Sequence, residues 1–135
     1  MKILPVFLLF TSLFAFSQNK LSITVEGVKT SNGKISVAVY NRSEGFLQFD
    51  QVYRYSSIAA HKGITYIAID DLPEGEYALA IFHDENGNDK LDTNWLGIPR
   101  ESIGFSRSHM RTFGPPRFKD CVLKINTDQQ IHVTL

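Results

Sequence analysis

Short segments in which apolar and polar residues alternate constrain the fold of this chain more than any other feature. Residues 21–25 and 35–40 are the clearest examples. A period of two is typical of strands with one buried face. Further strands are expected at residues 53–60, 64–69 and 77–83. Because no segment has a convincing helical period, the sequence predicts an all-β fold, a single antiparallel β-sandwich.

The ends and connections of these segments give more detailed expectations. The pair Asn32 and Gly33 is a hairpin signal between the first two strands. The strand at 77–83 is apolar on both faces, so it should be central in its sheet. Residues 121–125 and 131–135 should form a closing hairpin.

The longest irregular region spans residues 84–116 and is rich in Gly, Pro and aromatic residues. Loops longer than about 12–15 residues are usually functional or disordered. Because aromatic side chains can pack, we expect one long ordered loop. Trp95, Phe105 and Phe113, with Phe118 just beyond, either anchor this loop on the sandwich or form a recognition surface for a sugar or peptide.

The first 17 residues are expected to be a secretory signal peptide. Lys2 precedes an uncharged apolar run, and Ala15 and Ser17 occupy positions −3 and −1 for cleavage before Gln18. The run is shorter than the ~20 residues of a membrane span. The sequence therefore predicts a signal peptide at 1–17, one domain at 18–135 without a membrane span, and export to the periplasm or the medium.

Charge and cysteine content exclude several classes of protein. The 135 residues contain 14 Lys and Arg against 14 Asp and Glu, for a formal net charge of +0. This balance argues against a nucleic-acid partner, which would call for a basic face. Cys121 is the single cysteine, so an internal disulfide and a multi-cysteine zinc site are both excluded. We expect Cys121 to be a small core residue.

A run of oxygen-bearing side chains directly after the strand at 77–83 predicts a metal site. Asp84, Asn86, Asn88 and Asp92 occupy positions 1, 3, 5 and 9 of a calcium-binding loop, and Lys90 would supply its backbone carbonyl at position 7. The expected cofactor is a weakly bound, structural calcium ion, with a dissociation constant of ~10⁻⁴–10⁻³ M. His83, Asn94 and Glu101 are additional candidate ligands or site residues.

The loop departs from the EF-hand pattern at two positions. Asp89 stands at position 6 in place of Gly, and Trp95 stands at position 12 in place of a bidentate Glu. Asn, Asp and Gly are also the ordinary residues of β-turns. A plain polar turn that binds no ion is therefore the alternative.

Several motifs together resemble the bacterial domain of unknown function 2141 family. They are Leu-Pro-Glu-Gly-Glu-Tyr-Ala at 72–78, Phe-His-Asp-Glu-Asn-Gly-Asn at 82–88, Lys-Leu-Asp-Thr-Asn at 90–94, Leu-Gly-Ile-Pro-Arg-Glu at 96–101, Gly-Phe-Ser at 104–106 and Gly-Pro-Pro-Arg-Phe at 114–118. The resemblance covers essentially the whole chain after residue 17. It implies a small exported bacterial protein without an established activity, and the family usually has Gly where this chain has Asp89. The Leu-Pro-x-Gly-x-Tyr turn is also similar to that of transthyretin-like and adhesin-repeat sandwiches, which implies an immunoglobulin-like or transthyretin-like fold.

Three functional hypotheses follow from these residues. The first is an exported, non-enzymatic sandwich in which the calcium loop organises the aromatic loop to recognise an envelope ligand or protein. The alternative is a metal-dependent hydrolase of an envelope carbohydrate or ester, centred on His83, Asp92 and Glu101. No known zinc-ligand spacing supports an enzyme. A subunit that assembles through an exposed strand edge is a third hypothesis, and the oligomeric state stays open.

Overall fold

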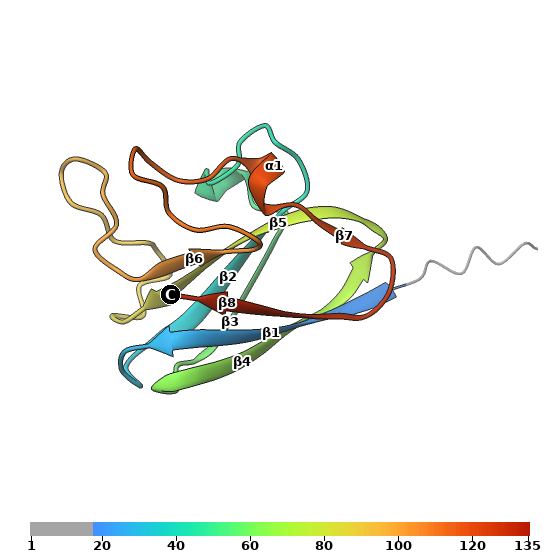
Figure 1. The fold of residues 1–135 in the computed structure, drawn as a ribbon. Coiled ribbons are helices and arrows are strands. Elements are labelled where there is room, and N and C mark those ends of the chain that lie inside the picture. Colours follow the sequence, from blue (N-terminus) through green and yellow to red (C-terminus); the bar gives the residue numbers. More distant parts are fainter. Residues whose placement is uncertain (1–17) are drawn as a thin grey trace, which may run out of the picture.

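The computed structural model describes residues 18–135, which form two β-sheets packed face to face (Figure 1). The expected signal peptide lies outside the described residues. The strands are β1 (Gln18–Val28), β2 (Lys34–Tyr40), β3 (Arg54–Ala59), β4 (Gly63–Pro73), β5 (Gly75–Asp84), β6 (Ile103–Phe105), β7 (Leu123–Ile125) and β8 (Gln129–Thr134). A 3₁₀ turn, η1 (Phe49–Gln51), and a one-turn helix, α1 (Phe118–Cys121), lie in the connections. The all-β sandwich predicted from the sequence is confirmed.

One sheet has the order β4-β1-β8 and the other has the order β3-β2-β5-β6, with β7 pairing the beginning of β5. The pairing of β1 with β8 is parallel, and the other strand pairs are antiparallel. Strand β5 is central, as expected, and β3 is an edge strand. The short strand β6 falls inside the region that the sequence indicated as irregular.

Both expected hairpins are wrong. The turn at Asn32 and Gly33 joins β1 to β2, but these strands belong to different sheets. Likewise β7 pairs with β5 and β8 pairs with β1, so residues 126–128 cross between the sheets. Asp128 fixes this crossing, because its carboxylate accepts a hydrogen bond from the Lys20 backbone N–H at 2.8 Å. Turn residues specify a change of direction, whereas the buried faces decide which sheet the next strand joins.

The space between the sheets is filled by branched aliphatic side chains. On β5, Leu79 and Ile81 point inward, and on β2 the inward set includes Val37. They meet Leu21, Ile23 and Val25 of β1, and all of these side chains are at most 1% exposed. Burial of such side chains contributes roughly 1.5–3 kcal/mol each to folding, so this layer dominates stability.

The opposite face of the β2–β5 pair carries a second, different cluster. It contains small and aromatic residues, namely Ala38, Tyr40, Ala78, Ala80, Phe105 and Cys121. Phe46 closes one side of the cluster with edge-to-face contacts to Tyr40 and Phe118, at 5.2 and 5.7 Å between ring centroids. Cys121 is buried as expected, but it ends α1 instead of lying in a strand. Figure 1 shows the connections after β2, β5 and β6 gathered on this side of the sheet.

Gly33 holds the turn before β2 against the loop that follows β5. Its φ is 65°, and a Cβ atom there would lie 2.0 Å from the backbone oxygen of Asp84. Only glycine combines the left-handed conformation with so close an approach. The turn and the candidate metal loop are therefore packed backbone against backbone.

Candidate functional site

An apolar groove lies on the outer face of the β3-β2-β5-β6 sheet. Its floor contains Ala38 and Ala80, which are directly opposite each other on β2 and β5. Phe82, two residues further along β5, and Phe105, opposite Ala80 on β6, extend the floor. Because two facing alanines leave space that larger side chains would fill, the groove has a volume of about 910 Å³. This volume is within the ~300–1,000 Å³ of small-molecule sites.

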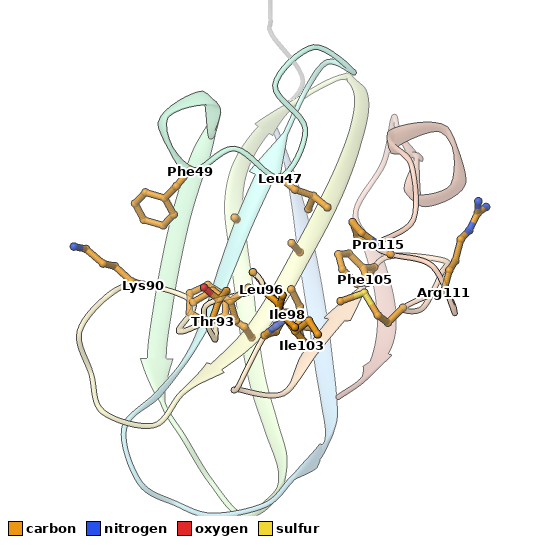
Figure 2. A pocket seen from close by; sticks show the side chains of 18 of the residues that line it. Leu47, Phe49, Lys90, Thr93, Leu96, Ile98, Ile103, Phe105, Arg111 and Pro115 are labelled. Carbon is orange, nitrogen blue, oxygen red and sulfur yellow. The ribbon is translucent and has the colours of Figure 1, made fainter.

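Three connections form the walls of the groove (Figure 2). Leu47 and Phe49 come from the segment between β2 and β3, Leu96 and Ile98 from the loop after β5, and Met110 from the segment after β6. Phe49, Leu96 and Ile98 are 57%, 61% and 55% exposed, respectively. Large exposed apolar side chains that are grouped around a groove, rather than scattered, are typical of a ligand-binding or protein-binding surface.

The loop aromatics divide into two groups. Phe105 is 2% exposed and lies in β6 beneath the groove, and Phe118 packs on Phe46. These two rings anchor the loops. Trp95 and Phe113 are 89% and 101% exposed, and Phe113 lines the groove. A recognition role therefore stays a prediction for Trp95 and Phe113, while the structure places Phe105 too deep for an exposed surface.

Asn94 organises the wall that carries Leu96 and Ile98. Its side-chain oxygen accepts hydrogen bonds from the backbone N–H groups of both residues, at 2.9 and 3.0 Å. Its own backbone N–H donates to the carbonyl of Ile98, and Thr93 bridges to Pro99. The segment is a small hairpin, and the Asn94 oxygen that was a candidate metal ligand is directed into its own turn.

Asp84 organises the first half of the candidate metal loop. It is fully buried, and its two carboxylate oxygens accept hydrogen bonds from the backbone N–H groups of Asn88 and Asp89, at 3.1 and 2.8 Å. Asp89 has a φ of 62°, the left-handed conformation that the EF-hand pattern assigns to Gly at this position. The tight turn is therefore present even though the residue is Asp.

Three candidate ligands converge in the second half of the loop. The side-chain amides of Asn86 and Asn88 donate to the two carboxylate oxygens of Asp92, at 2.6 and 2.9 Å. These bonds, the one from Asn88 foremost, hold the pKa of the Asp92 carboxyl below its ordinary value. The oxygens of the same two amides accept backbone N–H groups within the loop, Asn86 from Asn88 at 3.2 Å and Asn88 from Lys90 at 3.0 Å. In the structure the hydrogen bonds of these side chains are thus satisfied within the loop, and a cation bound through the amide oxygens would have to replace these bonds.

Glu101 joins the two ends of the loop. One oxygen accepts a hydrogen bond from the Glu85 backbone N–H at 3.2 Å, and the other accepts from the Asp92 backbone N–H at 3.1 Å. Burial raises the pKa of this carboxyl above its ordinary value. The geometry assigns Glu101 the role of a clamp on the loop backbone.

Lys34 and Tyr55 tie the loop to the sheet through Asp89. The Lys34 ammonium forms an ion pair with the Asp89 carboxylate, which also accepts a 3.4 Å hydrogen bond from the Tyr55 hydroxyl. The hydrogen bond from Lys34 lowers the pKa of Asp89. Sequence reasoning missed this contact, because Lys34 and Tyr55 lie on β2 and β3, far from the loop in sequence.

His83 is separated from the other candidate residues by the alternation of β5. It shares the inward face with Leu79 and Ile81, is 1% exposed, and contacts the Asn32 carbonyl through Nε2 at 2.7 Å. Its Nδ1 lies 3.7 Å from a Glu85 oxygen. Among residues 18–135, no hydrogen bond or ion pair joins His83 to Asp92 or Glu101. His83 is thus not linked directly to the other two groups of the hydrolase hypothesis.

Two further side chains with nucleophilic atoms, Ser106 and Cys121, are buried. Ser106 donates a hydrogen bond to the Cys121 carbonyl at 2.6 Å and accepts one from the Leu79 N–H at 2.9 Å. Burial raises the pKa of the Cys121 thiol to about 11. Within the described part of the chain, no three His, Cys, Asp or Glu side chains form a metal cluster. The candidate calcium loop would rely on amide and backbone oxygens beside Asp84 and Asp92.

Comparison with known proteins identifies the family. The family model described as "Uncharacterized protein conserved in bacteria (DUF2141)" matches residues 23–133. The chain belongs to this family. The match confirms the resemblance seen in the motifs, and in this DUF2141 protein the motifs at 82–88, 90–94 and 96–101 form the end of β5 and one groove wall. No curated protein and no solved structure matches the chain.

The structure also bears on the expected absence of a membrane span in this DUF2141 protein. Across residues 18–135, no helix has the length and apolar character needed to cross a bilayer.

Proposed function

We propose that this protein is an exported, non-enzymatic binding module that takes an apolar ligand into the groove on β2 and β5. The groove is the observation that supports the proposal. The small side chains of Ala38 and Ala80 leave space above its floor, and its walls present large, exposed apolar side chains. Covering those side chains with a ligand removes apolar surface from water, which contributes roughly 25 cal/mol per Å². The proposal includes export with cleavage before Gln18, which mass spectrometry of protein recovered from the periplasm or medium would detect.

The groove can be tested with a neutral solvatochromic dye such as Nile red. The expected result is saturable binding with a blue-shifted emission that Ala80→Leu reduces at least tenfold, since the larger side chain fills the floor. Ala68→Leu is the matched control, because Ala68 lies on β4 in the other sheet. Equal dye binding by both variants would overturn the groove as the site.

We further propose that residues 84–92 bind calcium as a structural ion. The ion would hold in place the groove wall that carries Leu96 and Ile98. Supporting observations are the hydrogen bonds of Asp84 to the loop backbone, the left-handed Asp89 and the convergence of Asn86 and Asn88 on Asp92. For a dissociation constant of ~1 mM, 10 mM calcium should stabilise the fold by about 1.4 kcal/mol. Magnesium should do less, because it retains more water ligands.

Thermal melts after chelation, with calcium or magnesium added back, test this ion site. Asp92→Asn should abolish the calcium-dependent rise in melting temperature, because it removes a ligand charge while keeping the side-chain size. Asp70→Asn is the control at an exposed carboxylate outside the loop. A melting temperature indifferent to calcium would establish the loop as a polar turn and leave the groove proposal standing.

A further inference from the structure

The charged residues around the groove restrict the kind of ligand it can hold. Lys90 and Arg111 both line it, and the lining includes no Asp or Glu. Figure 2 shows these two basic side chains on opposite sides of the apolar group. Both charged residues of the lining are therefore cations, and a cation favours an anionic group on the ligand.

The two basic residues differ in their partners. The Arg111 guanidinium donates to the Asp120 carboxylate at 2.7 Å, so its charge is already paired. Lys90 is exposed, and among residues 18–135 no carboxylate lies within 4.0 Å of its ammonium group. Only its backbone N–H is engaged, by the Asn88 side chain at 3.0 Å. One unpaired cation at one end of the groove matches a ligand with a single negative charge.

The rest of the lining matches an aliphatic chain. The floor at Ala38 and Ala80 carries small side chains. The walls above it present the aliphatic side chains of Leu47, Leu96, Ile98 and Met110 together with the rings of Phe49 and Phe113. A saturated chain can follow such a surface and bury methylene groups at about 0.8 kcal/mol each. In Figure 2 the Lys90 ammonium group is directed away from the apolar side chains, and the flexible four-carbon stem allows it to turn toward the end of that chain.

We propose that the groove binds a free long-chain fatty acid, with the carboxylate beside Lys90 and the hydrocarbon chain across Ala38 and Ala80. This inference rests on the proposed function of the groove. It adds the class of ligand, its direction in the groove and the residue that recognises its charge. Calcium at the neighbouring loop is not required, since the Lys90 side chain is not one of the loop's candidate ligands.

Displacement of Nile red by three ligands with the same sixteen-carbon chain provides the test. Hexadecanoate should displace the dye at lower concentration than neutral hexadecanol, and cationic hexadecyltrimethylammonium should be the weakest. Lys90→Gln should weaken hexadecanoate about five- to tenfold, as expected for loss of a charge-assisted contact, and leave hexadecanol unchanged. The control Lys62→Gln, at an exposed lysine outside the groove lining, should change neither ligand.

The possible failures are distinguishable. If the dye binds but hexadecanoate does not displace it, the fatty-acid assignment is wrong and the groove proposal stands. If acid and alcohol bind alike and Lys90→Gln affects neither, the role of Lys90 is overturned. If the dye itself does not bind, the proposed function fails together with this inference.

Discussion

The two faces of the β3-β2-β5-β6 sheet are built from the same strands but pack in opposite ways. Toward the β4-β1-β8 sheet, β2 and β5 present Val37, Leu79 and Ile81, which interlock with another regular sheet and are fully buried. Away from it, the alternate positions carry Ala38 and Ala80, covered by irregular connections that leave a groove. The face toward the β4-β1-β8 sheet is therefore fully packed and stabilises the fold, whereas the outer face contains an apolar groove.

This contrast shows how a small domain can separate stability from binding. Alternate residues of a strand point to opposite faces, so each face can change without altering the other. The regular face needs complementary side chains from two sheets. The irregular face needs only anchors such as Phe46 and Phe118, and its loops can carry Leu96 and Ile98 above a floor of alanine.

Truncating a side chain on the filled face should have the largest effect on stability. Ile81→Ala should lower the free energy of unfolding by about 2–5 kcal/mol, because it leaves a cavity between two sheets. Ile98→Ala, on the groove wall, should change it by less than about 0.5 kcal/mol. Denaturant unfolding measures both values, and comparable losses would contradict the division of roles.

Gly33 tests how tightly the turn before β2 supports the loop beside the groove. Gly33→Ala should cost more than the roughly 1–2 kcal/mol of a left-handed backbone, since the new Cβ would meet the Asp84 oxygen at 2.0 Å. Gly63→Ala is the control, because its φ is 89° and nothing lies within 4 Å of the added atom. Equal losses in thermal or denaturant unfolding would show that the close approach is unimportant.

Enlarging a side chain should distinguish a filled face from an open one. Ala80→Leu should cost less than about 1 kcal/mol, because the added atoms enter the groove. Val37→Phe should cost about 1–3 kcal/mol, because the inward face of β2 has no spare volume. A larger loss for Ala80→Leu than for Val37→Phe in urea unfolding would contradict the openness of the groove.

The smallest expected effect concerns the link from the loop to the sheet, and it depends on pH. The Lys34 hydrogen bond lowers the pKa of Asp89, so the pair stabilises the fold above the ordinary Asp range and loses this effect as pH falls through the lowered value. Lys34→Met should therefore lower the melting temperature slightly at neutral pH, and the difference should shrink below about pH 4. Lys62→Met serves as the control, and a difference independent of pH would exclude the ion pair as its cause.

The sequence predicted the strands that form the regular face better than it predicted the groove on the irregular face. The period of β1 and the two apolar faces of β5 follow from side-chain alternation, and the spacing from Asp84 to Asp92 located the loop. The facing of Ala38 and Ala80 depends on the register between β2 and β5, which no local pattern specifies. The pairing partners of β7 and β8 were missed for the same reason, because strand pairing depends on residues far apart in the sequence.

The role of Asn94 was also beyond the sequence. An Asn near a run of acidic residues has the chemistry of a metal ligand, but here its oxygen accepts two N–H groups of its own turn. Either use satisfies the same atom, so residue type alone does not distinguish them. Leu96 and Ile98 can be recognised as groove-wall residues only from the fold, which places their exposed side chains above Ala38 and Ala80.

The parallel pairing of β1 with β8 has a consequence for the order of events during folding. Contacts such as Lys20 with Asp128 join residues 108 positions apart, and β1 is the central strand of its sheet. Loop closure over such a span is entropically costly, and topologies of this kind fold slowly, in milliseconds to seconds. While residues 129–134 are still being synthesised, one edge of β1 has no partner, so the β4-β1-β8 sheet is completed only after β8 has left the ribosome.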